Sequence, residues 1–393
     1  MLLKYVVDTS TLLRIPGVVS KYDCVITAPV LRELEKHKLA KDEGLRYQAR
    51  EATRVLIDSD VDVDLKDYTF SLNDEFDPQY NDNKLIQACI NNGHGLITDD
   101  LLLRIKAKGF GVQVIIPEEQ ELYTGYMDVC LSDEELANLY SNLRHNKYNL
   151  LTNQYLIIRN SCGEIIQKYR WDGKEHVDLK LPPRKYVKVL NGYQECALDL
   201  LNNKDIPIKI IAGVAGSGKT YMNIRMGMYL TFEKGFYNKI LIVRPPVGAS
   251  NGSGDNGLGF LPGDKWNKMA DFFKPIYDQL DDGGRLLQEK SQQGLIEFDV
   301  PYYMKGTSKN ASQWVMVDEA EDLNVKTLSL IGTRIGEGSC IVMSGDIDQA
   351  ENKFKDNNGL GTFINLRKGN PLVGVVVLKE NVRSATSNLF MGL

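Results

Sequence analysis

One stretch of the sequence has the spacing of a phosphate-binding loop. Residues 213–220 fit the pattern G-x-x-x-x-G-K-[ST], follow the apolar run Ile208–Ala212 and precede a helical pattern. In such a loop, backbone N–H groups converge on phosphate oxygens, Lys219 carries a positive charge for the β- and γ-phosphates, and Thr220 can ligate Mg²⁺. We therefore predict a nucleoside triphosphate site, and a chance glycine-rich turn is the alternative. The nucleotide-binding residues would be Gly213, Val214, Ala215, Gly216, Ser217, Gly218, Lys219 and Thr220.

Two carboxylates follow a second apolar run. Asp318 and Glu319 come directly after Val315–Val317. Because α/β sheets build their sites at the carboxyl ends of strands, both side chains are expected to face the phosphates. Asp318 would hold Mg²⁺ through water, and Glu319 would orient or deprotonate an attacking water. This arrangement favours hydrolysis over transfer to a small acceptor. An acidic pair that caps the next helix is the alternative.

Other polar residues could complete the nucleotide site. Asp346 and Gln349 follow another apolar run and would face the γ-phosphate, with a solvated turn as the alternative. Gln194 could hydrogen-bond an adenine edge, although a lone glutamine on an amphipathic helix is usually solvated. Arg334 and Arg383 are candidates for an arginine that neutralises charge on the transferring phosphoryl group. A surface or ion-pair role is equally open for each arginine.

Acidic residues recur at expected strand ends and helix starts in the N-terminal region. Asp8 follows the apolar run Leu3–Val7. Carboxylates that converge on one sheet edge repel one another unless divalent cations neutralise them, and oxygen ligands suit Mg²⁺ or Mn²⁺. Such a cluster is typical of two-metal phosphodiester hydrolysis. The alternative is that each acid caps a helix or is solvated. The candidate metal ligands are Asp8, Glu33, Asp82, Asp99 and Asp100.

The composition is that of an ordinary globular protein. The chain has 393 residues, of which 43% are hydrophobic and 25% charged, and this length suggests about two to three domains. Its net charge of -5 gives no general attraction for nucleic acids, so any polyanion site must be local. Six cysteines lack a Cys-x-x-Cys pair, and zinc is poorly supported. The apolar runs are far shorter than the ~20 residues that span a bilayer, and no leader pattern precedes the first strand, so we expect a cytoplasmic protein without a membrane segment.

Strand-length apolar runs alternate with helical patterns in two regions, which predicts an α/β fold with two parallel sheets. In the second region the expected strands are Ile208–Ala212, Lys239–Val243, Trp314–Val317, Cys340–Ser344 and Val373–Leu378. We expect an N-terminal α/β domain over residues 1–117, a linker with one capped helix over 118–150, a small antiparallel β module over 151–184, and a C-terminal α/β domain over 185–393.

The motifs of the C-terminal region resemble those of PhoH-type ATPases over about half the chain. This resemblance implies ATP hydrolysis in a P-loop core related to the superfamily 1 helicases and acting on RNA. The sequence departs from the family at Glu321-Asp322, where Gln-Asn is usual, and at Lys305-Gly306, where Arg-Gly is common. The resemblance is carried by Gln194, Gly213–Thr220, Arg244-Pro245-Pro246, Leu258–Gly263, Asp318-Glu319-Ala320, Thr333–Gly336 and Gly345-Asp346-x-x-Gln349.

The first 117 residues resemble a PIN-domain ribonuclease. The resemblance is carried by residues 6–10, 28–34, 81–86 and 96–104. It implies a catalytic set of Asp8, Glu33, Asp82 and Asp100, with Asp99 as an extra ligand or an outer-shell acceptor. A PIN domain fused to a PhoH ATPase is a known architecture. It implies ATP-driven translocation or unwinding that delivers single-stranded RNA to a metal-dependent ribonuclease, in a homo-oligomer for which the family suggests a hexamer.

Two other functions stay open. One is a nucleotide-gated binding or scaffold protein whose PIN domain is inactive. The other is a P-loop kinase, which is disfavoured because no acceptor site or lid accompanies Asp318-Glu319. Near the domain junction, basic residues could contact phosphates and tyrosines could stack on bases, although a solvated linker and packing are the alternatives. These residues are Arg184, Lys185, Lys188, Tyr186 and Tyr193.

Overall fold

The computed structural model describes residues 3–40, 43–117, 123–245, 274, 276–278, 280, 284–304, 311–347 and 358–382. The chain forms two compact units, Met1–Glu121 and Leu122–Leu393, and each is considered by itself. The expected α/β class with parallel sheets is confirmed in both units. No helix in these described ranges has both the length and the apolar character needed to cross a bilayer.

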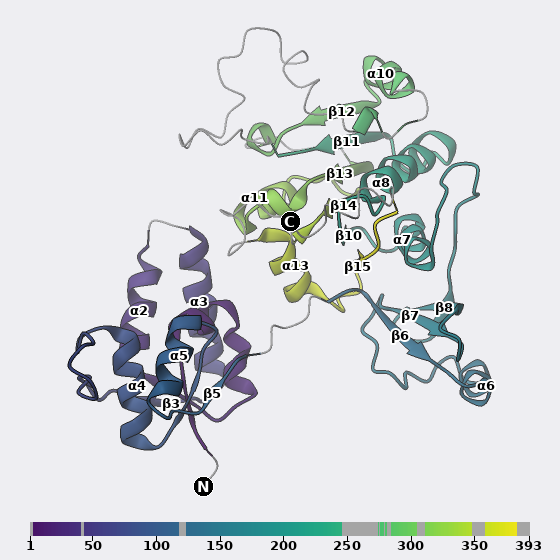
Figure 1. The fold of residues 1–393 in the computed structure, drawn as a ribbon. Helices are drawn as coiled ribbons and strands as arrows, with labels where there is room; N and C mark the ends of the chain where they lie inside the picture. Colours follow the sequence, from purple (N-terminus) through teal and green to yellow (C-terminus); the bar gives the residue numbers. More distant parts are fainter. Residues whose placement is uncertain are drawn as a thin grey trace. The chain divides into compact units, whose positions relative to one another are not determined.

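The first unit contains a five-stranded parallel sheet in the order β3-β2-β1-β4-β5 (Figure 1). Its strands are β1 (Tyr5–Val7), β2 (Cys24–Thr27), β3 (Asp62–Asp64), β4 (Gly95–Ile97) and β5 (Val114–Ile115). Its helices are α1 (Thr9–Arg14), the 3₁₀ turn η1 (Pro16–Ser20), α2 (Ala28–Lys38), α3 (Glu43–Asp58), α4 (Asn81–Asn92) and α5 (Leu101–Gly109). The strand order reverses between β1 and β4, and such a switch point is where open α/β sheets place their ligand sites.

The second unit is built on a six-stranded sheet in which every pair is parallel, with the order β12-β11-β13-β14-β10-β15. The strands are β10 (Ile208–Gly213), β11 (Lys239–Val243), β12 (Ile296–Asp299), β13 (Gln313–Val317), β14 (Cys340–Gly345) and β15 (Val373–Leu378). The five strands expected here from the sequence are therefore confirmed, and β12 is additional. Parallel sheets have both faces covered, which explains the nearly continuous apolar runs.

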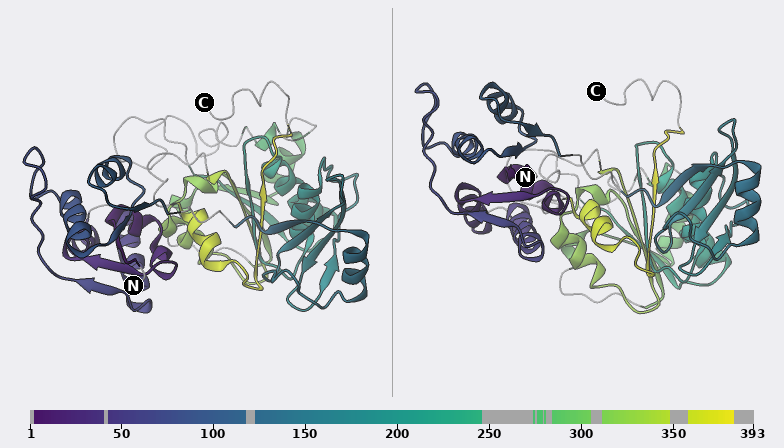
Figure 2. Two further views of the ribbon diagram at one scale, coloured as in Figure 1. Left: turned by 60° about the horizontal axis from the view of Figure 1, so that its bottom comes forward. Right: turned by 90° about the horizontal axis from the view of Figure 1, so that it is seen from below.

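Helices lie on both faces of this sheet, as the two further views show (Figure 2). Successive residues of a strand point to opposite faces of the sheet, and each face has its own hydrophobic core. Ile211 and Trp314 belong to the core on one face, and Ile210 and Val315 belong to the core on the other face. Helices α7 (Gly192–Asn202) and α8 (Lys219–Met228) cover the first face, and α11 (Val325–Gly332) and α13 (Gly359–Arg367) the second. The remaining helices are the π-helical η2 (Tyr229–Glu233), α10 (Arg285–Gln292), and the 3₁₀ turns η3 (Pro301–Met304) and η4 (Ala320–Asp322).

A small four-stranded sheet corrects the expected boundaries of the middle region. It comprises β6 (Tyr126–Cys130), β7 (Tyr155–Arg159), β8 (Ile165–Trp171) and β9 (His176–Asp178). Residues 118–150 are thus not only a linker, because they supply β6 and the expected capped helix, α6 (Asp133–Ser141). The module is also not purely antiparallel, since β6 pairs with β7 in parallel. Half-exposed and polar positions in β6 hide its strand pattern in the sequence.

Both faces of the small sheet are covered. Tyr155 and Ile157 of β7 point into the core shared with α7 and α8, whereas Leu156 and Ile158 pack with α6 through Leu139. The module is therefore an integral layer of the second unit.

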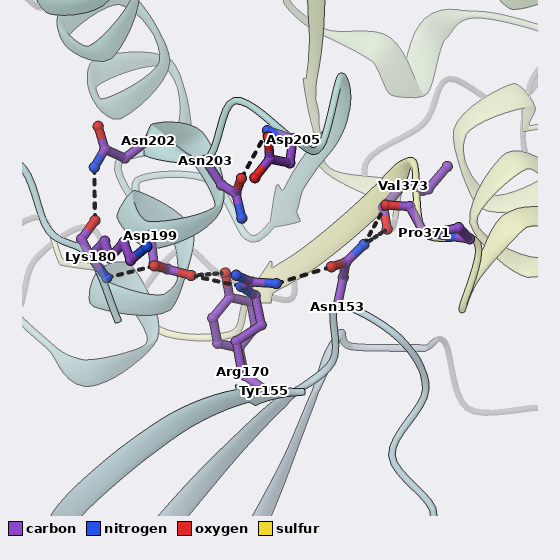
Figure 3. A network of polar contacts seen from close by, with 10 residues as sticks. All are labelled: Asn153, Tyr155, Arg170, Lys180, Asp199, Asn202, Asn203, Asp205, Pro371 and Val373. Carbon is purple, nitrogen blue, oxygen red and sulfur yellow. Dashed lines mark hydrogen bonds and ion pairs between the residues drawn. The ribbon is translucent and has the colours of Figure 1, made fainter. Parts of the chain in front are cut away.

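A buried polar network joins the small sheet to the six-stranded sheet (Figure 3). Asp199 of α7 accepts hydrogen bonds from the Tyr155 hydroxyl at 2.8 Å, the Arg170 Nε at 3.2 Å and the Lys180 N–H at 2.7 Å. Arg170 also donates to Asn153 Oδ1, and Asn153 Nδ2 donates to the carbonyls at 371 and 373, beside β15. Because Asp199 is only 2% exposed, its charge is neutralised by these partners and not by water.

Replacing Asp199 by alanine should lower the free energy of unfolding of the second unit by about 3 kcal/mol, since it leaves the Arg170 guanidinium buried without its carboxylate. Denaturant unfolding followed through the unit's tryptophans would measure the loss. Glu175→Ala is the matched control, because Glu175 pairs with Arg144 at the exposed surface and should cost less than about 0.5 kcal/mol. Equal losses in the two variants would contradict the structural role of the network.

Candidate nucleotide and metal sites

The loop between β10 and α8 has backbone conformations that only glycine adopts without strain. Gly213, Gly216 and Gly218 have φ angles of 137°, 77° and 90°. A Cβ at Gly213 would lie 2.1 Å from the Leu378 carbonyl oxygen of β15. The loop is fixed there by the Val214 N–H, which donates to that same carbonyl at 3.0 Å. Its shape is therefore set by the neighbouring strand.

Lys219 begins α8 and points back across the loop. Its Nζ donates to the carbonyls of Gly213 at 2.6 Å and Val214 at 2.9 Å. Burial lowers the pKa of Lys219, and the nearby negative charges of four acids oppose that shift. Those acids lie after β13 and β14, so the carboxyl ends of three strands converge on this ammonium group. They are Asp346, Glu321, Glu319 and Asp318.

The acids after β13 have distinct partners. Asp318 accepts a hydrogen bond from the Thr220 hydroxyl at 3.0 Å, and burial raises its pKa to about 6. Glu319 accepts from Arg244 Nη2 at 2.7 Å, and Arg244 follows the end of β11. Glu319 also has a φ of 51°, a left-handed conformation that is uncommon for a residue with a side chain. The expected pair is thus held by one hydroxyl and one guanidinium.

Glu321 is a buried acid beside this pair. It is 4% exposed, and burial together with the neighbouring charge of Glu319 raises its pKa to about 9. The side chain therefore keeps its proton to a higher pH than a free glutamate does, and the protonated carboxyl has one donor and one acceptor like an amide. This is one of the two positions at which the sequence departs from the PhoH pattern.

A cavity of about 340 Å³ adjoins the loop, which is within the range of small-ligand sites. Gln194 forms part of its wall, and its amide is engaged on both sides: Nε2 donates to the Ser217 carbonyl at 3.0 Å, and Oε1 accepts from the Leu190 N–H at 2.7 Å. Gln194 therefore supports the loop, with one amide hydrogen and one lone pair left for a ligand. The other residues of the wall are Lys188, Leu190, Gly216, Gly218, Lys219, Thr220, Tyr221 and Val382.

Several residues expected in the nucleotide site are not placed there. Some of them lie outside the described residues, namely Gln349, Arg383, Leu258–Gly263 and Lys305-Gly306. Arg334 is half-buried at the end of α11 and does not line the cavity. Of the junction residues, Lys188 lines the cavity. The tyrosines pack instead: Tyr193 against Tyr126, and Tyr186 against Tyr229.

Asp8 lies at the switch point of the N-terminal sheet. It is 6% exposed and accepts hydrogen bonds from the Ser10 hydroxyl and, at 3.1 Å, from Thr98 Oγ1. Burial raises the pKa of Asp8, while these two hydroxyl donors lower it. Thr98 ends the strand that neighbours β1, so the hydroxyl reaches Asp8 across the reversal of strand order.

Three other expected acids lie within electrostatic reach of Asp8. The pKa of Asp82 is raised to about 6, first by burial and then by the charges of Asp8, Asp100 and Glu33. Glu33 accepts a hydrogen bond from the Asn81 side chain, which comes from the start of α4. Asp100 caps α5 by accepting the Leu103 N–H at 2.7 Å. The structure thus places the four carboxylates expected from the sequence within electrostatic reach of one another.

Asp99 points to a different set of partners. It accepts from Thr11 Oγ1 at 2.9 Å and from Ser10 Oγ at 3.2 Å, and it pairs with Arg14. Because its charge is already neutralised by a guanidinium, its geometry is that of an outer-shell acceptor behind Ser10. It does not appear among the groups that raise the pKa of Asp82.

Hard divalent cations suit these oxygen donors. Burial, and after it the charges of Asp8, Asp100 and Glu33, raise the pKa of Asp82, and a cation bound beside these acids would oppose that shift. Nevertheless, no group of three acids lies close enough together to hold an ion already in place, as far as the described residues reach. The donors fit a divalent metal, and they would have to move closer together to bind it.

Sequence reasoning missed residues that orient the expected acids. Direct contacts to Glu319 come from Arg244, and direct contacts to Asp8 come from Ser10 and Thr98. Two further residues, Tyr80 and Lys106, lie beside Asp82. Ser10 and Thr98 stood inside the motif segments and could have been identified as hydroxyl donors to a buried carboxylate. The contact between Arg244 and Glu319 spans 75 residues and carries no local signal.

Glu321→Gln should stabilise the second unit, and more so at high pH. The folded state keeps the Glu321 proton up to about pH 9, whereas the unfolded chain loses it near pH 4.3. Stability therefore falls as pH rises between these values in the native protein, and glutamine cannot titrate. The Tm difference between variant and native protein should grow from pH 5 to pH 8.5 in calorimetry. Glu337→Gln, at an exposed carboxylate, should show no such growth. An equal gain at both pH values would contradict a protonated Glu321.

Comparison with known proteins identifies a family for each of the two regions. Residues 186–391 match the PhoH-like protein family, and residues 5–116 match the PIN domain. Protein PhoH2 of Bacillus subtilis (strain 168) is 27% identical over 98% of both chains. Protein PhoH2 of Thermobispora bispora is also 27% identical, over 98% of this chain and 95% of the relative. Protein PhoH of Escherichia coli (strain K12) is 33% identical over 44% of this chain and 49% of the relative.

The match to the PhoH-like family covers just over half of the residues of this chain. The chain therefore belongs to the PhoH-like family of P-loop ATPases, and it carries a PIN domain before its ATPase region.

Proposed function

We propose that this protein hydrolyses ATP to translocate or unwind RNA and delivers single-stranded RNA to a metal-dependent endoribonuclease site. The observation that carries the proposal is the presence, in one chain, of a phosphate-binding loop faced by the acids of β13 and β14 and of a carboxylate cluster at the switch point of a second parallel sheet. The first site suits a nucleotide, and the second suits a phosphodiester.

In the ATPase site each residue has a role that follows from its contacts. Lys219 would exchange its two loop carbonyls for the β- and γ-phosphates, which offer charge as well as lone pairs. Thr220 and Asp318, already joined by a hydrogen bond, would hold Mg²⁺. Glu319 would act as the base for the attacking water, and Arg244 holds its carboxylate in one orientation. Mg²⁺, when bound, would neutralise charge on the phosphates.

In the nuclease site the four carboxylates would be metal ligands. The hydroxyls of Ser10 and Thr98 hold Asp8 in one orientation. Asp82, whose pKa is raised to about 6, is the carboxylate that gains most from a neighbouring cation. Bound Mg²⁺ or Mn²⁺ would activate water and stabilise the leaving oxygen. Asp99 would act indirectly, by fixing Ser10 with the help of Arg14.

The proposal includes the finer points that the family resemblance implies. These are helicase activity, RNA as the nucleic acid, a homo-oligomer with a hexamer as the implied form, and a cytoplasmic location. We also propose a division of labour in which residues 1–117 form the nuclease domain and residues 185–393 the ATPase domain. The small sheet would transmit force within the second unit, because the Asp199 network fixes it to α7.

A second function is favoured by one observation. The four acids are not assembled for a metal within the described part of the chain. This would suit an ATP-gated nucleic-acid-binding or scaffold ATPase whose PIN domain is inactive. The two functions differ in whether the protein cuts RNA at all when Mg²⁺ or Mn²⁺ is supplied.

Asp8→Asn should abolish metal-dependent cleavage of a labelled single-stranded RNA and leave ATP hydrolysis unchanged. Loss of an outer-shell partner alone typically costs 10- to 100-fold at a metal site, so loss of a ligand should cost at least about 100-fold. Cleavage with Mn²⁺ and phosphate release from ATP would be measured on the same preparation. Asp58→Asn is the matched control, because Asp58 is exposed at the end of α3. Intact RNA with the native protein would favour the scaffold function.

Lys219→Ala should have the opposite pattern. ATP hydrolysis should fall by about 100- to 1000-fold, the usual cost of removing one preorganised charge from a reacting centre. Cleavage of unstructured RNA should persist, while any ATP stimulation on hairpin RNA should disappear. Lys234→Ala, at an exposed lysine of the same unit, should keep both activities. Unchanged hairpin cleavage in Lys219→Ala would show that the two sites work independently.

A further inference from the structure

Lys106 is held beside the acidic site by groups that do not neutralise it. It lies in the last turn of α5, with its Nζ 5.0 Å from the ring centre of Phe76 and 5.4 Å from that of Tyr80. Its Nζ also lies 3.3 Å from the side-chain oxygen of Asn83 in α4. Two rings and an amide thus orient the ammonium group. Among the ion pairs of the described residues none involves Lys106.

Lys106 and Tyr80 both face the carboxylates. The Lys106 Nζ contacts Asn83, which directly follows Asp82 in α4. Tyr80 is the residue before α4 and adjoins Asn81, whose side chain donates a hydrogen bond to Glu33. Tyr80 keeps 53% of its surface exposed. An exposed ring and an oriented cation therefore border the same acids.

This combination matches a nucleotide chemically. A phosphate needs a cation near the acidic site, because four carboxylates would otherwise repel the substrate backbone. An exposed aromatic ring offers a stacking surface to a base, and that base must be unstacked from a duplex to use it. With a net charge of -5, the protein has no general attraction for a polyanion, so such a local contact matters.

We propose that Lys106 and Tyr80 form the strand-binding subsite of the acidic site, where Lys106 binds a backbone phosphate and Tyr80 stacks on an adjacent base of single-stranded RNA. This proposal rests on the nuclease function proposed above. The competing role for the same contacts is structural: Lys106 would only fasten the segment that carries Phe76 and Tyr80 to α5.

Photocrosslinking tests the subsite without requiring cleavage. The full-length protein would be mixed in EDTA with a single-stranded RNA that contains 4-thiouridine, irradiated and mapped by mass spectrometry. Crosslinks are expected in the peptide that contains Tyr80. They should fall about 5-fold or more in Tyr80→Ala and remain in Tyr80→Phe, because stacking uses the ring and not the hydroxyl. No crosslink to this peptide in the native protein would overturn the proposal.

Lys106→Gln tests the phosphate contact against Lys108→Gln, a matched control at an exposed lysine of the same helix. The slope of log crosslink yield at the Tyr80 peptide against log salt should become shallower by about 0.7 in Lys106→Gln only. In cleavage, KM for RNA should rise several-fold while kcat changes little. Lys106→Arg should restore both. Equal slopes for Lys106→Gln and Lys108→Gln would overturn the phosphate contact.

The two proposals fail in different ways. Crosslinks at Tyr80 without cleavage by the native protein in Mn²⁺ would reject the nuclease function and support the subsite. Cleavage without crosslinks at Tyr80 would support the nuclease function and reject the subsite. Circular dichroism of each variant would show whether the fold is retained, and the comparison of Lys106→Gln with Lys108→Gln provides the test if Tyr80→Ala unfolds.

Discussion

Parallel strands end at a common edge of their sheet, and both candidate sites depend on this constraint. In the second unit the carboxyl ends of β10, β13 and β14 place Gly213, Asp318 and Asp346 around one loop, although more than a hundred residues separate the first from the last. In the first unit the ends of β1 and β4 place Asp8 against Thr98. Chain connectivity matters less here than strand order, because hydrogen-bond register decides which side chains meet.

The same constraint creates a problem of charge. Acids gathered at one edge are partly buried, and each buried charge costs free energy unless it is paired, hydrogen-bonded or protonated. The two units contain all three solutions. Arg244 pairs with Glu319, hydroxyls donate to Asp8 and Asp318, and Glu321 keeps its proton. Glutamate at position 321 is compatible with the site because, in the neutral form, it offers the same hydrogen-bonding groups as glutamine.

The sequence predicted elements that combine an apolar run with a motif, and it missed those that lack either. β13 is buried along its whole length, β10 is buried except at its first residue, and both lead into chemically distinctive residues. β2 is also buried but has only four residues, and β3 is mostly exposed with an Asp-Val-Asp sequence. Asp8, Asp82 and Asp100 could be singled out from the sequence because each follows a strand or lies in the first turn or at the cap of a helix, whereas Glu33 lies within α2 and was singled out by its motif. The partners that orient them were not, since Arg244 and Lys106 reach their acids only through the tertiary fold.

The two sites also differ in how far they are assembled. In the nucleotide site, hydrogen bonds already connect Thr220 with Asp318 and Arg244 with Glu319, and Gln194 supports the loop from behind. Binding therefore needs little reorganisation beyond the release of Lys219 from its carbonyls. In the acidic site, no three carboxylates of the described residues form a metal-binding group, and burial together with the neighbouring acids raises the pKa of Asp82 to about 6. Cations and protons compete for such a site, so its occupancy must depend on pH as well as on metal concentration. The proposed nuclease site would therefore depend on metal and on pH, whereas the described groups of the nucleotide site are already connected to one another.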